Sequence, residues 1–394
     1  MTATQAGNRF DLAELAGAFG DLGTLIPFIV AYVSILKMDP SGILLGFGVA
    51  LIVVGAYYKT PFPVQPMKAI GTAAITQTAG AVVLTPAIVA GAGMATGLFW
   101  LLLGMSGLAK RLSLLIPKPV LIGIVMGLGF SFMREGIIMM DGNWWLAAVL
   151  LGLTLYLLSR SRVPAMLLLL ATGMAAALFE QPAPADSLSM IKPEFRLPEF
   201  HWSSISLNDL WLGTILLALP QQPLTFGNAL MAITEENNRL FPDRPVSERK
   251  VGFSTGLMNL WSSAIGGIPM CHGAGGMAGH VRFGARTGGA AIMLGALLLT
   301  LALFFGSSMM TILALFPTPV LGVILFLAGA ELALGGRPHD QERGSRFVVI
   351  ATAAFAMWHV GAAVVFGFLL HHAAGRAGSS SESLPCRRRR RSAS

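Results

Sequence analysis

The chain has 394 residues, of which 54% are hydrophobic and 12% are charged, and its mean hydropathy is +0.70. Soluble globular domains average about 25% charged residues, so this composition excludes a water-soluble protein. The net charge of +8 does not indicate a nucleic acid partner, because the positive residues stand at the ends of apolar segments. The two cysteines lie in different contexts and exclude a disulfide framework.

Apolar segments of about 20 residues, separated by short polar breaks, predict membrane-spanning helices along most of the chain. We expect an all-α membrane protein with fourteen segments, the third and tenth being broken by Pro and Gly. The first seven are predicted near residues 11–36, 41–58, 62–80, 85–109, 112–133, 143–158 and 163–179. The second seven are predicted near residues 207–232, 249–265, 267–281, 287–308, 311–334, 346–358 and 360–373.

An internal repeat relates the two groups of seven. Residues 115–121 (LIPKPVL) recur as residues 315–321 (LFPTPVL), an offset of 200. Pro27 and Pro223 interrupt the first helix of each half at a similar offset. Because seven is an odd number, a tandem copy of this unit must be inverted in the membrane. Paired interruptions in inverted repeats are typical of the binding sites of secondary transporters.

The distribution of positive charge predicts the topology. With the N-terminus inside, 22 of the 27 Lys and Arg residues fall at cytoplasmic positions and four on the opposite side, while Lys68 remains in the membrane. This bias follows the positive-inside rule and predicts a multi-pass protein of the inner (cytoplasmic) membrane with both termini in the cytoplasm. The membrane domain is expected at 1–374, with halves at about 11–180 and 207–373. Residues 375–394 are expected to form a disordered basic tail, with binding to anionic lipid as the alternative.

The third segment carries the strongest candidate for a binding site. Prolines at 61, 63 and 66 forbid a helix through this stretch, but a helix can begin at Pro66. We expect an extended run and then a half-helix from about Met67 to Thr78, whose N-terminus offers free N–H groups and about half a positive charge. Lys68 lies in the first turn, where a buried cation needs an anionic partner. The alternative is that Lys68 reaches the membrane interface.

The tenth segment is predicted to mirror the third. Residues 266–276 (GGIPMCHGAGG) read as an extended run followed by a glycine-rich helix start in mid-membrane. Small residues let an anion approach backbone N–H groups closely. The spacing of Gly273, Gly275 and Ala278 mimics a dinucleotide fingerprint, but no strand–turn–helix unit surrounds it.

Polar residues also interrupt the eighth and first segments. Gln221, Gln222, Thr225 and Asn228 are uncharged hydrogen-bonding residues in an apolar span, where they either line a site or bond neighbouring helices. Because Asn228 lies six residues beyond Gln222, the four cannot share one helix face.

The first segment adds Glu14, Asp21 and Thr24. Asp21 is expected well within the span, where it pairs with Lys68 in the empty state, carries a coupling proton, or caps a helix start. Two half-helix ends and one lysine sum to about +2, which fits a dianion better than a neutral nucleobase.

An enzyme is a poor alternative for this sequence. Cys271 and His272 look like a nucleophile and base, but adjacent side chains rarely face one another and nothing identifies an orienting acid. His272, His280, His371 and His372 lack zinc spacing. We therefore expect no enzyme activity, no metal and no cofactor.

Four strings resemble the molybdate transporter family, a branch of the sulfate permease superfamily. They are residues 20–24 (GDLGT), 63–69 (PVQPMKA), 220–228 (PQQPLTFGN) and 269–276 (PMCHGAGG), the last continuing through Gly279 and His280 to 282–288 (RFGARTG). The resemblance covers essentially the whole membrane domain. It implies a seven-plus-seven inverted-repeat fold like that of uracil permease and the sulfate permeases, with a core domain and a gate domain interleaved from both halves. It also implies a homodimer formed through the gate.

The resemblance implies secondary transport of a tetrahedral oxyanion, with molybdate as the first choice and sulfate as the alternative, by an elevator-like movement of the core. A nucleobase permease is less well supported, because Gln221 and Gln222 stand where the nucleobase branch usually has a glutamate. An anion channel is an alternative of a different class, which saturable counterflow would distinguish from a carrier. A coupling proton or other ion and membrane lipids are the remaining expected partners. The expected substrate-binding residues are Thr24, Gln65, Lys68, Gln221, Gln222, Thr225, Cys271, His272, Gly273 and Ala274, and the candidate coupling residues are Asp21 and Glu14.

Overall fold

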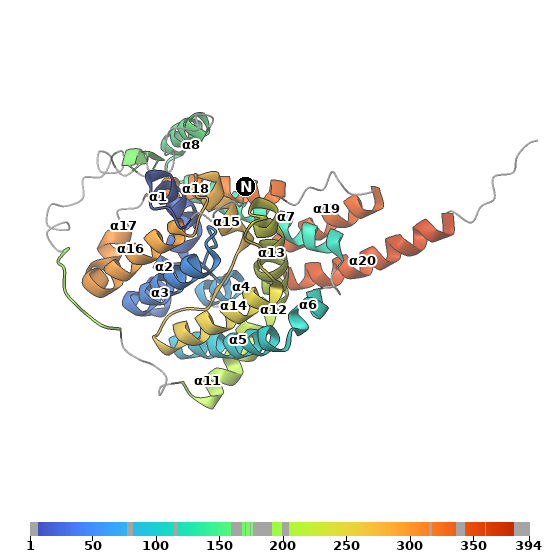
Figure 1. Cartoon of the computed structure of the whole chain (residues 1–394), viewed down its shortest axis with the longest axis horizontal. Helices are drawn as coiled ribbons and strands as arrows, with labels where there is room; N and C mark the ends of the chain where they lie inside the picture. Colours follow the sequence, from blue (N-terminus) through green and yellow to red (C-terminus); the bar gives the residue numbers. More distant parts are fainter. Residues whose placement is uncertain are drawn as a thin grey trace, which may run out of the picture.

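The computed structural model describes residues 7–76, 82–113, 117–158, 168–169, 171–173, 175, 191–198, 205–314, 317–335, 343–358 and 360–381. Within these ranges the regular structure is helical apart from one two-stranded ladder (Figure 1). The prediction of a mostly helical fold is confirmed.

The first half of the chain starts with a bent helix. Its elements are α1 (Leu12–Ala18), η1 (Phe19–Asp21), α2 (Leu22–Leu36), α3 (Pro40–Tyr58), β1 (Gln65–Pro66), α4 (Lys68–Thr76), α5 (Pro86–Ser106), α6 (Leu108–Ser113), α7 (Lys118–Met140) and α8 (Trp144–Leu158). The direction changes by 42° between the helical pieces Leu12–Asp21 and Thr24–Val30. Pro27 lies inside α2. The interruption predicted at Pro27 is therefore wrong, because the bend lies between Asp21 and Thr24, directly after the 3-10 turn.

The second half begins with one long helical rod. Its elements are α11 (Leu207–Leu212), η3 (Gly213–Ala218), α12 (Leu219–Leu224), η4 (Thr225–Ala232), α13 (Ile233–Leu240), α14 (Glu248–Ala264), β2 (Met270–Cys271), α15 (Ala274–Arg282), α16 (Gly289–Phe305), η5 (Gly306–Ser308), α17 (Met309–Ala314), α18 (Thr318–Gly335), α19 (Arg343–Trp358) and α20 (Val360–Ser381). The rod continues without a break through Pro223, so the interruption predicted there is also wrong. Two π-helical stretches, η3 and η4, flank the proline-containing turn, and such wider turns accommodate a proline's missing hydrogen bond.

Fewer helices than predicted are long and apolar enough to cross a membrane unaided. Among the described residues there are four, or five if the bent α1–α2 pair counts as one span. The half-helices α4 and α15 are too short to span, and the continuous 207–240 rod alternates between short α-helical and π-helical stretches. Most of the segment expected at 163–179 lies outside the described residues. Helix α20 continues through Gly375 to Ser381, and residues 382–394 are not described.

The helices pack in two groups, and each group combines both halves of the chain. In one group α3 packs against α16 and α5 against α14, while in the other α7 packs against α18 and α19 (Figure 1). Glycines permit this close packing: a Cβ at Gly48 would lie 2.9 Å from the Gly295 carbonyl oxygen, and one at Gly129 would lie 2.6 Å from that of Gly329. Small residues at such contacts are how membrane helices approach closely.

Candidate functional site

Two short strands bring the third and tenth segments together. β1 and β2 pair antiparallel, with Gln65 opposite Cys271 and Pro66 opposite Met270. The ladder continues at Met67, whose N–H donates to the Pro269 carbonyl at 2.9 Å. Each strand leads into a half-helix, α4 or α15, so the extended run and helix start predicted in each segment are both present. The ladder therefore joins the two segments in the protein interior, directly before each helix start.

Gln65 links a buried lysine to a buried carboxylate. Its Nε2 donates to the Asp21 carboxylate and to Thr24 Oγ1, the latter at 3.1 Å. Its Oε1 accepts from Lys68 Nζ at 3.3 Å. All four side chains are at most 7% exposed. The expected pairing of Asp21 with Lys68 is thus bridged by an amide rather than made directly.

Lys68 is held by neutral groups. Besides Gln65, its ammonium lies over the ring of Phe132 on α7, 4.1 Å from the ring centroid. Among the described residues no carboxylate lies within ion-pair distance of it. Because Lys68 is only 7% exposed, its charge is buried inside the protein and does not reach the surface.

The first N–H groups of both half-helices bind amide oxygens of the 207–240 rod. Gln221 Oε1 accepts from the Ala69 N–H at 2.8 Å and the Ile70 N–H at 3.3 Å, at the start of α4. Asn228 Oδ1 accepts from the Ala274 N–H at 3.1 Å, at the start of α15. Gln221 and Asn228 are seven residues apart on this rod, so the rod contacts both helix starts. Helix starts carry partial positive charge, and here neutral oxygens satisfy them.

Of the other two candidate polar residues of the rod, one contacts the half-helix cluster and one bonds within its own helix. Gln221 Nε2 donates to Thr225 Oγ1 at 3.0 Å, which places Thr225 beside the start of α4. Gln222 donates instead to the Ala218 carbonyl of its own helix at 3.0 Å. The structure therefore brings Gln221, Thr225 and Asn228 together with the half-helices and leaves Gln222 outside this cluster.

His272 and Gly273 shape the ladder on the β2 side. His272 Nδ1 lies 2.9 Å from the Pro63 carbonyl, to which it must donate, and Nε2 then accepts from the Ser254 hydroxyl at 2.7 Å. Both ring nitrogens are thus engaged, and the ring ties the stretch before β1 to α14. A Cβ on Gly273 would overlap Gln65 Oε1, so glycine is needed for the amide to take this position. Cys271 is a free, buried thiol.

Glu14 lies in a different hydrogen-bond network. Its two carboxylate oxygens accept the backbone N–H groups of Arg286, at 3.0 Å, and Thr287, at 3.2 Å. The side chain is fully buried. These bonds fasten the segment after α15 onto α1.

The comparison with known proteins decides the family. The sequence model of a family described as "Molybdate transporter of MFS superfamily" matches residues 13–132 and 213–332. The chain belongs to the molybdate transporter family. The two matched stretches begin 200 residues apart, at 13 and 213, the same offset as the repeat around Pro117 and Pro317.

Plant members of the family are similar over most of their length. Molybdate transporter 2 of Arabidopsis thaliana is 33% identical over 404 residues, covering 90% of this chain and 85% of the relative. Molybdate transporter 1 of the same plant is 32% identical over 406 residues, covering 92% and 87%. The family is one of transporters, not of enzymes.

Solved structures show the fold of this family member. The transmembrane domain of the cyanobacterium bicarbonate transporter BicA has a TM-score of 0.61 at 16% identity, covering 91% of this chain and 96% of that one. The murine anion transporter Slc26a9, in an inward-facing state, also has a TM-score of 0.61, at 11% identity, with coverage of 94% and 69%. The chain therefore has a multi-pass membrane-transporter fold of this type.

Three residues of the site region were not selected from the sequence. Asn259 of α14 holds β2 in place, since its amide bonds the Met270 N–H at 3.0 Å and the Met270 carbonyl at 2.7 Å. His280 of α15 is fully buried; its Nδ1 donates to the Gly17 carbonyl at 2.8 Å, and its Nε2 has no hydrogen-bond partner among the described residues. Phe132 is an aromatic residue in an apolar helix, so nothing in the sequence marks it as part of a site. His280 does have one, because it continues the tenth-segment string.

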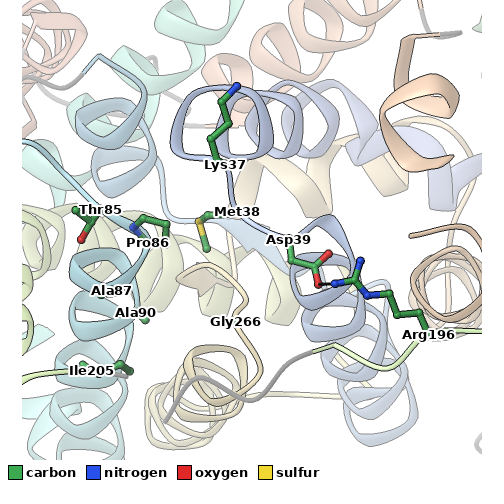
Figure 2. A pocket seen from close by; sticks show the side chains of 10 residues that line it. All are labelled: Lys37, Met38, Asp39, Thr85, Pro86, Ala87, Ala90, Arg196, Ile205 and Gly266. Carbon is green, nitrogen blue, oxygen red and sulfur yellow. Dashed lines mark ion pairs between the residues drawn. The ribbon is translucent and has the colours of Figure 1, made fainter. Parts of the chain in front are cut away.

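A separate cavity of about 440 Å³ lies between the α2–α3 turn, the start of α5 and the connector before α11 (Figure 2). Asp39 and Arg196 form an ion pair of 3.6 Å on one side of it, and Ala87, Ala90 and Ile205 lie on the other. None of the candidate site residues lines this cavity.

Proposed function

We propose that the protein is a secondary carrier that moves a tetrahedral oxyanion, molybdate first, across the inner membrane. The observation that carries this proposal is Lys68, a buried cation at the start of α4 that contacts Gln65, whose amide oxygen lies against Gly273 at the start of α15. A charge buried without a counter-ion is costly, and a bound anion would remove that cost. The names of the plant relatives support molybdate as the anion.

We assign the anion to the space between the two half-helix starts. Its oxygens take the place of the Gln221 amide oxygen at the Ala69 and Ile70 N–H groups, and its charge pairs with Lys68. Gln65, Thr24 and Thr225 supply further donors, and Gly273 and Ala274 allow close approach from the other side. Cys271 and His272 hold the strand, and Gln222 supports its own helix.

The proposed architecture is fourteen segments in a seven-plus-seven inverted repeat. The equivalent strands β1 and β2 run in opposite directions, as inversion requires, and the family sequence model matches each half separately. The pairs α3–α16 and α5–α14 exchange with each other under the repeat offset. In the proposed cycle this core group, with the half-helices, moves against the α7–α18–α19–α20 group in an elevator-like step. The latter group also forms a homodimer contact, and both termini are cytoplasmic.

Asp21 is the proposed coupling residue. Its hydrogen-bonded link to Lys68 runs through Gln65. A proton on Asp21 would weaken its hold on the Gln65 amide and so change the contact that Gln65 makes with the lysine. This gives proton binding a direct route to the anion site.

Uptake of radiolabelled molybdate by the purified protein in liposomes tests the proposal. We expect saturable uptake that depends on the imposed pH gradient, counterflow between two labelled pools, and weaker competition by sulfate than by tungstate. Non-saturable flux without counterflow would indicate a channel. Absence of molybdate binding and uptake by a correctly folded protein would contradict the proposal.

A further inference from the structure

The ring of Phe132 joins the lysine of one helix group to the other group. Lys68 begins α4, which packs against α2 and α12, whereas Phe132 belongs to α7, which packs against α18 and α19. The ring is 9% exposed and its centroid lies 4.1 Å from Lys68 Nζ. The cation–π contact is therefore desolvated, the setting in which such contacts are strongest.

The Phe132 ring and a bound oxyanion would attract the Lys68 ammonium in different directions. Lys68 has only two partners among the described residues, the Gln65 oxygen and the Phe132 ring. An anion in the proposed site attracts the ammonium much more strongly than a ring quadrupole does. Pairing with the anion at the start of α4 therefore draws Nζ away from α7.

We infer that Phe132 is a positioning residue that holds Lys68 in the empty carrier and releases it when the oxyanion binds. This inference rests on the proposed function. The ring compensates the buried charge while the site is empty, and at the same time it ties the two helix groups together. Substrate binding breaks that tie. Phe132 thus competes with the substrate and sets its affinity from outside the group that carries the anion.

Substitution at position 132 gives an expected direction that a simple packing role does not. Phe132→Leu removes the competing ring but keeps an apolar side chain, so molybdate should bind more tightly. Kd should fall at least about threefold, out of the roughly 30-fold that a fully desolvated cation–π contact represents. Phe132→Tyr should restore the wild-type Kd. The maximum rate of molybdate exchange should stay within about twofold of wild type. The substitution should therefore lower KM while leaving kcat nearly unchanged.

Ring fluorination tests the electrostatic cause with almost no change of shape. Mono-, di- and trifluorinated phenylalanine at position 132 should lower Kd for molybdate stepwise, because each fluorine weakens the negative face of the ring. Phe130→Leu, on the half-exposed side of the same helix, is the matched control and should leave Kd unchanged. A flat fluorination series, or weaker binding in Phe132→Leu, overturns the inference. If wild-type protein itself binds no molybdate, the proposed function fails instead.

Discussion

The two half-helices share a geometry but differ in chemistry. α4 follows a proline-rich strand and carries Lys68 in its first turn, whereas α15 follows Gly273 and has basic residues only in its last turn. Both starts are satisfied by amide oxygens of the same rod, Gln221 for α4 and Asn228 for α15. The repeat therefore supplies two similar positive helix ends, but only the first half supplies a full charge. We expect charge recognition to depend on α4 and close fit on α15.

The largest effect should come from removing the charge. Lys68→Ala should weaken molybdate binding by more than about 100-fold, since breaking a buried ion pair costs about 3–5 kcal/mol. Equilibrium binding to the purified protein measures this. Lys118→Ala, at the exposed start of α7, is the control and should bind normally. Wild-type affinity in Lys68→Ala would show that α4 does not supply the charge.

Placing a carboxylate at each helix start compares the two halves directly. Gln221→Glu puts a fixed anion on the α4 N–H groups beside Lys68, so it should compete with molybdate and weaken binding by about tenfold or more. The melting temperature should hold or rise, because a negative charge at a helix start is worth about 0.3–2 kcal/mol. Asn228→Asp makes the same change at α15, which has no lysine, and should cost about threefold. If the two substitutions weakened molybdate binding equally in titrations, the proposed difference in charge recognition between α4 and α15 would be wrong.

Gly273→Ala tests close fit on the α15 side. The new Cβ would displace the Gln65 amide and break its bridge between Lys68 and Asp21. Losing one such hydrogen bond at about 1 kcal/mol corresponds to roughly fivefold lower kcat/KM in uptake assays. Gly152→Ala, where a Cβ meets open space, should behave as wild type. Unchanged transport in Gly273→Ala would mean that the bridge is dispensable.

The smallest effect on transport should come from Glu14. Glu14→Gln removes the charge from two hydrogen bonds to backbone N–H groups and should lower the free energy of unfolding by about 1–3 kcal/mol. KM for molybdate and its response to pH should not change in the folded protein. Thermal unfolding in detergent and uptake at several pH values measure the two quantities. A lost pH response with normal stability would assign coupling to Glu14 after all.

The backbone of the site could be predicted from sequence better than its side-chain partners. Prolines 61, 63 and 66 prevent a helix before Lys68, and an ionisable residue in an apolar segment stands out, so both half-helices and the lysine were expected. Pro223 misled the prediction because π-helical turns absorb it, which depends on packing around the rod. The contacts of Asn228 and Phe132 depend on how distant helices are placed. A single sequence contains no signal for that placement.

The short ladder between β1 and β2 also constrains how the chain could have arisen. A polypeptide that ended after the first half would present β1 with unbonded backbone groups inside lipid, at a cost of several kcal/mol for each. Such a half-length ancestor would need a second copy, inserted the opposite way round, to complete its own backbone. Fusion of the two copies into one gene makes that mutual dependence permanent, and it frees each strand's neighbours to diverge.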